Sequence, residues 1–357
     1  MRILLQGAFN NNFGDNLFAL LFYDSLKNAF SEDEIYFNES ERFGIGDRLA
    51  REIGYTKKGI IKKADALVYF SGGYFGEKRN SIRETIGRYI VYCKVADRFK
   101  RNPIYIISVG AGPISNKFLR SKIVNIFSRA KLAIVRDEQS AKYLQEYGVK
   151  NQIVVSTDTA LLINESNVGS NTFVESIPAG KRIFFHISQL NTDEIDKISY
   201  AIIDFLESND WSIYVGYDGY SKNAERLDVV NHIKSIIGEN KVIYYEYKTA
   251  KDFCAFLNEM DMIITPKLHV GIVSSCLGKS VISFPHHQKI KRYYSQIGYG
   301  NRCYQLSDLS STEIAHLLDV YKDDPVIVPE NYREMAQNNI DSLIHELRTL
   351  KRKIDGK

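Results

Sequence analysis

The sequence predicts two doubly wound α/β domains, each built on a mostly parallel sheet. Three observations lead to this fold class. The chain has 357 residues, and domains commonly contain ~100–200 residues, which favours two. Short apolar runs alternate with longer segments at helical spacing, which is the pattern of βα units. A polar stretch over 164–171, rich in Asn, Ser and Gly, divides this alternation into two series and has the composition of a linker.

The first series predicts an N-terminal Rossmann-like domain over 1–165. Its apolar runs are short and several end at Gly or a polar residue, as buried strands do. The expected strands are 3–5, 66–70, 104–109, 132–135 and 153–155. Amphipathic helices are expected in 16–30, 82–99, 118–130 and 140–147.

The second series predicts a C-terminal Rossmann-like domain over 175–325. The expected strands are 182–187, 211–216, 241–245, 262–265 and 280–284. Helices are expected near 193–208, 222–237, 249–258, 269–277 and 311–322. A long polar amphipathic helix over 331–353 follows and could pack on either domain. Two such domains would bind a ligand in the cleft between the carboxyl ends of their strands.

The composition excludes several classes of protein. A formal charge of +4, from 47 cations and 43 anions, argues against a general nucleic-acid binder. The four cysteines contain no CxxC pair, which disfavours zinc and disulfide frameworks and fits a reducing cytoplasm. No run approaches the ~20 apolar residues of a membrane span, and the first residues lack the apolar core of roughly 7–15 residues of a signal peptide. We therefore expect a cytoplasmic protein whose membrane contact, if any, is peripheral at the inner face.

Cations and histidines gather after two successive strands of the second series. Lys267 and His269 follow the first of these strands and begin a helix of small residues. The second strand is followed by His286, His287, Lys289 and Lys291. The carboxyl ends of neighbouring parallel strands share one edge, and the N–H groups of a helix N-terminus attract anions. The sequence thus predicts an anion site in which a histidine can donate a proton.

Turns of the first series offer polar groups at strand ends as well. In the turn after the first strand, Asn12 and Gly14 tolerate unusual backbone angles, and either Asp15 or Asn16 can cap the next helix. Arg136, which follows a later strand, can grip a carboxylate or phosphate with two hydrogen bonds. Each has a plainer alternative, an ordinary turn in the first case and a surface Arg–Asp pair in the second.

Two glycine-rich turns complete the set. Gly72 and Gly73 would let a substrate approach the backbone closely, and the ring of Tyr74 offers a face on which a sugar could stack. Gly112 lies in the turn after the most apolar strand. Tight turns with buried aromatic residues would have the same sequence pattern, so this plainer alternative stays open.

Taken together and in this order, these segments resemble the polysaccharide pyruvyl transferase family, from Gly7 to about Gly298. The matching motifs are N-x-G-D at 12–15, SGGYFG at 71–76, GAGP at 110–113, VRD at 135–137, KLH at 267–269 and P-x-x-x-K at 285–289. The chain departs from the family at three places. Lys267 stands where the family usually has Arg, 286–288 reads His-His-Gln rather than Tyr-Asp-Pro, and 216–220 lacks the usual His-Ser strand ending.

The resemblance implies a GT-B-like pair of Rossmann-like domains that transfers pyruvate from phosphoenolpyruvate to a sugar, closing a cyclic ketal and releasing phosphate. It makes His269 the catalytic acid and Arg136 a second catalytic residue. The implied donor-binding residues are Arg136, Lys267, His269, Lys289 and His287. The implied acceptor-binding residues are Asn12, Gly14, Asp15, Gly72, Gly73, Tyr74 and Gly112. Candidates for the base are Asp15, Asp137 and Glu77, and the scheme needs no metal and no cofactor.

The implied acceptor is a hexose or N-acetylhexosamine of a cell-surface polysaccharide precursor, such as one for a capsule, exopolysaccharide or cell wall, either free or attached to a lipid diphosphate. The C-terminal cations Arg348, Lys351, Arg352, Lys353 and Lys357 could touch an anionic bilayer, but a solvated helix end is the favoured interpretation, since lipid-binding clusters need about 4–8 cations near one surface. Two other functions stay open, a nucleotide-sugar glycosyltransferase of GT-B fold and a non-catalytic glycan-binding protein.

Overall fold

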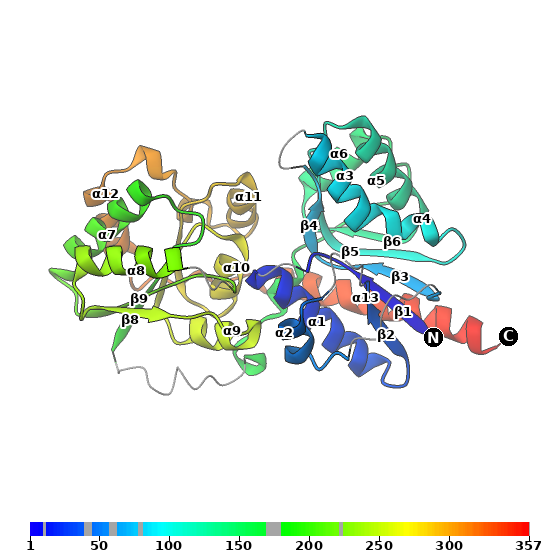
Figure 1. Ribbon diagram of the computed structural model, residues 1–357, viewed down its shortest axis with the longest axis horizontal. Helices are drawn as coiled ribbons and strands as arrows, with labels where there is room; N and C mark the ends of the chain where they lie inside the picture. Colours follow the sequence, from blue (N-terminus) through cyan, green and yellow to red (C-terminus); the bar gives the residue numbers. More distant parts are fainter. Residues whose placement is uncertain are drawn as a thin grey trace. The chain divides into compact units, whose positions relative to one another are not determined.

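The computed structural model (Figure 1) describes residues 1–9, 12–38, 45–56, 63–77, 81–168, 180–220 and 224–356. The chain forms two compact units. The first unit contains most of the chain up to Thr159 together with Arg333–Lys357, and the second contains Ala160–Tyr332. Asn12, Phe13 and Gly14 belong to the second unit, although they lie near the start of the chain. The last residues of the predicted linker, 169–171, lie outside the described residues.

The first unit is built on a seven-stranded parallel sheet. Its strands are β1 (Arg2–Gln6), β2 (Glu34–Phe37), β3 (Ala66–Tyr69), β4 (Gly72–Phe75), β5 (Ile104–Ala111), β6 (Ala130–Val135) and β7 (Val154–Val155). They are arranged β2-β1-β3-β5-β6-β7, with β4 also paired to β5. The central strands are buried on both faces, which is why they read as continuous apolar runs.

Helices cover both faces of this sheet. They are α1 (Phe13–Ala29), α2 (Asp47–Glu52), α3 (Ile82–Arg88), α4 (Lys94–Arg98), α5 (Lys117–Arg129), α6 (Glu138–Glu146) and α13 (Glu330–Asp355). A π-helical turn, Tyr89–Cys93, joins α3 to α4. Figure 1 shows α3, α4, α5 and α6 side by side over one face, with α1 and α13 on the other. Short 3-10 turns at Thr159–Leu162 and Glu165–Asn167 lead out of the unit.

The second unit is built on a five-stranded parallel sheet of order β10-β9-β8-β11-β12. Its strands are β8 (Lys181–His186), β9 (Trp211–Gly216), β10 (Val242–Tyr245), β11 (Met262–Thr265) and β12 (Ser280–Ser283). Its helices are α7 (Thr192–Leu206), α8 (Ala224–Ile237), α9 (Ala250–Asn258), α10 (Leu268–Cys276), α11 (Gln288–Gln296) and α12 (Ser311–Tyr321). From β8 the next strands are added on one side of the sheet, as β9 and β10, and the later ones on the other, as β11 and β12. The position between β8 and β11 is therefore a topological switch point, and open sheets of this kind bind ligands at the carboxyl ends of the strands that flank it.

The predicted fold class, α/β with two Rossmann-like doubly wound domains, is confirmed, and the structure adds detail. The glycine-rich segment expected as a turn contains the short strand β4, because Gly72 pairs with Val109 of β5. The helix α11 was not predicted. Lys289 and Lys291 lie on this helix.

The helix α13, whose position the sequence left open, packs on the first unit. Its buried side chains include Ala336, Ile340 and Leu343. The buried amide of Asn339 donates a hydrogen bond to the carbonyl oxygen of Thr157, 3.1 Å away. That carbonyl also accepts from the hydroxyl of Ser108 at 2.6 Å. The last helix is thereby attached to the carboxyl edge of the first sheet.

Asn339→Ala is expected to lower the free energy of unfolding by about 1–2 kcal/mol, since it removes a buried hydrogen bond and leaves part of the Thr157 carbonyl unsatisfied. The neighbouring Asn338 is exposed and provides the matched control, because Asn338→Ala keeps every buried contact and slightly raises helix propensity. Urea denaturation followed by circular dichroism measures both. Equal effects of the two substitutions would contradict the anchoring role of Asn339.

Candidate functional site

A chain of polar side chains runs across the switch point of the second sheet. His186 ends β8 and is fully buried. Its Nδ1 lies 2.8 Å from Oγ1 of Thr265, the last residue of β11. Its Nε2 lies 3.0 Å from Oγ of Ser188, which in turn donates to Oδ1 of Asp218 at 2.7 Å. The two strands that flank the switch point are thus joined by a buried histidine.

Lys267 closes this series of hydrogen-bonded side chains into a ring. Its backbone N–H donates to Oγ1 of Thr265 at 3.1 Å, and its Nζ lies 3.7 Å from Oδ2 of Asp218. We call these five residues, His186, Ser188, Asp218, Thr265 and Lys267, the switch-point ring. Lys267 is held at both its main chain and its ammonium group.

The ring has one consistent assignment of protons. Ser188 gives its hydrogen to Asp218, so Ser188 must accept from Nε2 of His186. Thr265 accepts from the Lys267 N–H, and its own hydrogen can go to Nδ1 of His186. Burial lowers the pKa of His186 against the opposing effect of Asp218, which selects a neutral imidazole with its proton on Nε2.

Asp218 is the negative member of the ring. Burial alone would raise the pKa of Asp218, but the hydrogen bond from His186, the positive charge of Lys267 and the hydrogen bond from Ser188 hold that pKa well below its usual range. Asp218 therefore stays ionised, as the counter-charge of Lys267. The pairing keeps the ammonium of Lys267 near the carboxyl ends of β9 and β11.

The helix α10 begins at this ring. Lys267 is its N-cap residue, without a side-chain capping bond, and His269 lies in its first turn. Gly271 permits α10 to lie close to α11, because a Cβ at this position would come within 2.5 Å of the Tyr294 hydroxyl oxygen. The lysine and histidine that the sequence singled out thus lie together at the start of one helix, beside the ring.

The predicted N-x-G-D turn supplies three residues to the same unit. The Phe13 N–H donates to the carbonyl oxygen of Asp218 at 2.6 Å, and Asn12 forms an antiparallel bridge with Gly219. A Cβ at Gly14 would lie only 1.8 Å from Nδ1 of His269. The structure therefore brings Gly14 against His269, a contact that only glycine permits.

A second group of predicted residues lines a small pocket of the second unit, of about 200 Å³. Its lining residues are Pro285, His286, His287, Gln288, Lys291 and Gln305. His286 also lies 3.6 Å from a carboxylate oxygen of Glu194. Lys289 is half-buried in the first turn of α11 and does not line this pocket.

In the first unit, Arg136 lies buried over glycines. It follows β6, and its Nη1 donates to Asp158 at 3.1 Å. A Cβ at Gly110 would lie 2.9 Å from Nη2 of Arg136, and one at Gly73 would lie 3.5 Å away. The two glycine-rich segments and the V-R-D segment of the sequence therefore meet around one guanidinium group. A surface ion pair, the plainer alternative for Arg136, does not describe a side chain that is only 7% exposed.

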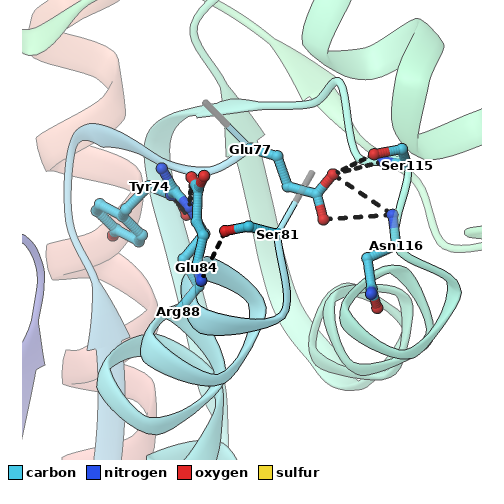
Figure 2. A network of polar contacts seen from close by, with 7 residues as sticks. All are labelled: Tyr74, Glu77, Ser81, Glu84, Arg88, Ser115 and Asn116. Carbon is cyan, nitrogen blue, oxygen red and sulfur yellow. Dashed lines mark hydrogen bonds and ion pairs between the residues drawn. The ribbon is translucent and has the colours of Figure 1, made fainter. Parts of the chain in front are cut away.

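The three carboxylates named as candidate bases differ in their surroundings. Figure 2 shows Glu77 accepting from Ser115 and Asn116, with Oε2 2.7 Å from the Ser115 N–H and 2.6 Å from its hydroxyl. Asp137 is the N-cap of α6 and accepts from Ser140 at 2.7 Å. Asp15 is half-buried in the first turn of α1. Glu77 and Asp137 thus both stabilise local structure, and the identity of the base remains a prediction.

Tyr74 is buried rather than presented as a stacking surface. Its ring stacks on Tyr92, with centroids 4.7 Å apart, and its backbone carbonyl accepts from Arg88 at 2.8 Å (Figure 2). A sugar could stack on this ring only if Tyr74 left the core. The other predicted acceptor positions here, Gly72 and Gly112, have positive φ values of 147° and 67°, which favour glycine.

Sequence reasoning missed several members of these clusters. His186 stands inside an apolar run and reads as part of a strand, and Ser188 follows it without a recognisable motif. Asp158 reads as an ordinary loop residue. The one available signal was position, since all three lie at or just beyond strand ends on the carboxyl side of their sheets. Within the described residues there is no group of three or more His, Cys, Asp or Glu side chains that could hold a metal ion.

Three kinds of comparison place the chain among known proteins. The family model described as polysaccharide pyruvyl transferase matches residues 12–288. No curated protein matches at a significant level. Among solved structures, UDP-GlcNAc 2-epimerase from Methanocaldococcus jannaschii has a TM-score of 0.66 at 10% identity, covering 97% of this chain and all of its own (100%).

Two further structures show the same fold. UDP-GlcNAc 2-epimerase from Neisseria meningitidis, bound to UDP-GlcNAc, has a TM-score of 0.65 at 12% identity over 98% of this chain and 100% of its own. The glycosyltransferase VinC, in complex with dTDP, has a TM-score of 0.54 at 10% identity over 100% of both chains. At such low identity these likenesses confirm the GT-B type of fold and nothing finer. The family model, which spans more than half of the sequence, is what assigns the chain: it belongs to the polysaccharide pyruvyl transferase family.

Proposed function

We propose that this protein transfers pyruvate from phosphoenolpyruvate to a sugar of a cell-surface polysaccharide precursor, forming a cyclic ketal and releasing phosphate. The observation that carries the proposal is the family match over residues 12–288. The clustering of Lys267 and His269 at the switch point of the second sheet supports it, because ligands of such sheets bind at this edge.

The donor is a dianion or trianion with a carboxylate and a phosphate group. Arg136 offers a planar guanidinium suited to two parallel hydrogen bonds with either group. Lys267 and Lys289 offer point charges, and His287 lines the pocket at the start of α11. Lys267 is the best defined of these cations, since the ring fixes its position before any donor arrives.

In this proposal His269 is the acid, the role that the family resemblance implies for it. Transfer of its proton to the methylene carbon of phosphoenolpyruvate leaves a cationic centre at the neighbouring carbon, and a sugar hydroxyl forms a bond there as a base takes its proton. A second hydroxyl of the same sugar then attacks that carbon and gives its proton to His269, which restores the acid. The carbon–oxygen bond to phosphate breaks, inorganic phosphate leaves, and the ketal ring closes. Asp15, Asp137 and Glu77 are the candidates for the base.

The acceptor is proposed to be a hexose or N-acetylhexosamine, either free or attached to a lipid diphosphate, and held by Asn12, Asp15, Gly72, Gly73 and Gly112. Asn12, Phe13 and Gly14 cluster with the second unit, and Gly14 lies against His269. The domain assignment of the proposal follows the sequence, with the acceptor on residues 1–165 and the donor on 175–325.

A nucleotide-sugar enzyme is the second candidate, because the structural neighbours include proteins solved with UDP-GlcNAc or dTDP. Calorimetric titration with phosphoenolpyruvate, UDP-GlcNAc and a dTDP-sugar separates the two. Mass spectrometry of sugar acceptors incubated with phosphoenolpyruvate then seeks the gain of pyruvate less one water. We expect phosphoenolpyruvate to bind and the mass gain to require His269, so that His269→Ala still binds acceptor but yields no product. Binding of nucleotide sugars alone would reject the proposal.

Gly14→Ala is expected to lower kcat/KM for pyruvyl transfer by roughly 10²-fold, since a side chain there must displace the imidazole of His269, and misplacement by about 1 Å has that scale of effect. Gly46→Ala is the control, because a Cβ at Gly46 meets nothing within 4 Å and its φ of −65° suits alanine. Initial rates of phosphate release, measured with matched thermal melts, compare the two variants. Full turnover by Gly14→Ala would remove His269 from the catalytic position.

Asp218→Ala is expected to lower the free energy of unfolding by about 2–4 kcal/mol at pH 7, because Lys267 loses its counter-charge and the buried Ser188 hydroxyl loses its acceptor. Asp196→Ala is the matched control. Asp196 also pairs with a histidine, His232, at 2.6 Å, but both side chains are partly exposed, so the cost should stay within about 1 kcal/mol. Urea denaturation measures both, and a similar cost for the two variants would argue against a tightly held ring.

A further inference from the structure

An apolar stripe on α3 lies open to solvent in the first unit. Ile82, Ile86 and Ile90 follow one another at four-residue intervals along α3 and the π-helical turn after it. Their side chains are 77%, 52% and 41% exposed. Phe118, in the first turn of α5, is 50% exposed. We call these four residues the α3 face. Exposed apolar residues are ordinary singly, but a run on one helix face marks a surface that contacts something.

The opposite side of the helix is fixed to the protein, which determines where the stripe points. Ser81 caps α3 by accepting from the Glu84 N–H at 3.2 Å. Arg88 pairs with Glu84 at 2.8 Å and donates to the Tyr74 carbonyl oxygen (Figure 2). Glu84 and Arg88 lie about half a turn around the helix from Ile82 and Ile86. With this side bound to the unit, the isoleucines must face outward.

Phe118 of α5 is connected to this stripe by Tyr89, which directly precedes Ile90 and whose ring packs against that of Phe118. The centroids of the Tyr89 and Phe118 rings are 5.3 Å apart. The ammonium of Lys122 lies over both rings, 5.2 Å from that of Tyr89 and 5.7 Å from that of Phe118. The helices α3 and α5 therefore form one continuous surface on which apolar and cationic side chains alternate.

The charge of this region is far from the average of the chain. Residues 81–129 contain ten Lys or Arg and only two acidic residues, whereas the whole chain has a net charge of +4. Both acids are engaged, Glu84 with Arg88 and Asp97 with Lys122 and the Tyr89 hydroxyl. Arg83, Lys94 and Lys117 are exposed next to the α3 face in sequence. The surface is both apolar and strongly cationic.

We propose that the α3 face docks this protein on an anionic lipid bilayer. The isoleucines and Phe118 enter the boundary between headgroups and acyl chains, and the flanking cations contact anionic headgroups. This extends the proposed function, since a lipid-attached acceptor lies at such a surface, and it assigns membrane contact to α3 and α5 rather than to the C-terminal cations of α13. Vesicle binding is measured without enzymatic turnover, so the docking proposal can be rejected independently of the proposal of pyruvyl transfer.

A second copy of the chain fits this surface less well. A twofold dimer brings identical patches together, so the cations of one copy would face those of the other. Four partly exposed side chains also supply much less contact than the roughly 1,000 Å² expected of a specific protein interface. Anionic headgroups neutralise the cations and receive the apolar stripe at once.

Co-sedimentation of the full chain with vesicles tests the proposal. We expect binding to vesicles of phosphatidylcholine with one-third phosphatidylglycerol, weak binding to phosphatidylcholine alone, and weaker binding as salt rises. The double variant Ile86→Ser with Ile90→Ser, and separately Arg83→Gln with Lys94→Gln, should each lower the partition coefficient at least tenfold. The matched control is Leu227→Ser with Val320→Ser, which removes apolar side chains of the second unit that are 52% and 50% exposed and should leave binding unchanged.

Thermal melts of each variant show whether it folds, and exposed substitutions of this kind usually change stability by within about 0.5 kcal/mol. Failure of the unaltered protein to bind anionic vesicles would overturn the proposal, as would an equal loss in the control pair. Sedimentation velocity supplies the remaining outcome. A dimer that Ile86→Ser with Ile90→Ser converts to monomer, with vesicle binding unaffected, would assign the face to a second copy instead.

Discussion

The hydrogen bond between His186 and Thr265 is the contact on which the second unit's functional edge depends. It joins β8 to β11, the two strands at which the order of strand addition changes from one side of the sheet to the other. The other members of the switch-point ring are linked, directly or through Ser188 and Asp218, to one of these two residues. Lys267 is linked to Thr265 by its main chain and to Asp218 by its ammonium group. Because His186 is buried and neutral, the ring carries only one full pair of opposite charges, Asp218 and Lys267. The start of α10, and with it His269, takes its place from this arrangement.

The strands of both sheets could be predicted from sequence because burial on two faces makes each a short, unbroken apolar run. β2 and β4 could not. Gly72 and Gly73 have poor intrinsic strand preference, and β4 forms only because Gly72 pairs with Val109. The helix α11 was missed although Ile290, Tyr293 and Tyr294 have helical spacing, since the segment was considered only for its cations and histidines.

The site divides in the same way. Residues in local motifs, such as Lys267 and His269, could be found because neighbouring letters carry the signal. The ring could not, since Ser188, Asp218 and Thr265 are separated by tens of residues and meet only after the sheet forms. Arg136 was found, but its partner Asp158 and the fit of the guanidinium over Gly110 depend on side-chain packing that no local pattern reveals. For Tyr74 the sequence left two alternatives open, a stacking surface for a sugar and a buried aromatic residue, and packing decides for the second, because the ring lies in the core.

The return of α13 to the first unit bears on the order in which the protein is made. All of Ala160–Tyr332 leaves the ribosome before the residues of α13 that complete the other unit. The second unit, with Asn12 to Gly14 already available, can therefore close its sheet and its ring during synthesis. The first unit begins earlier but must wait, with the Thr157 carbonyl and the sheet face beneath α13 uncovered, until α13 has been synthesised. The half of the chain synthesised first is thus the half that finishes folding last. It is also the half that most needs chaperones to protect it from aggregation in the interval.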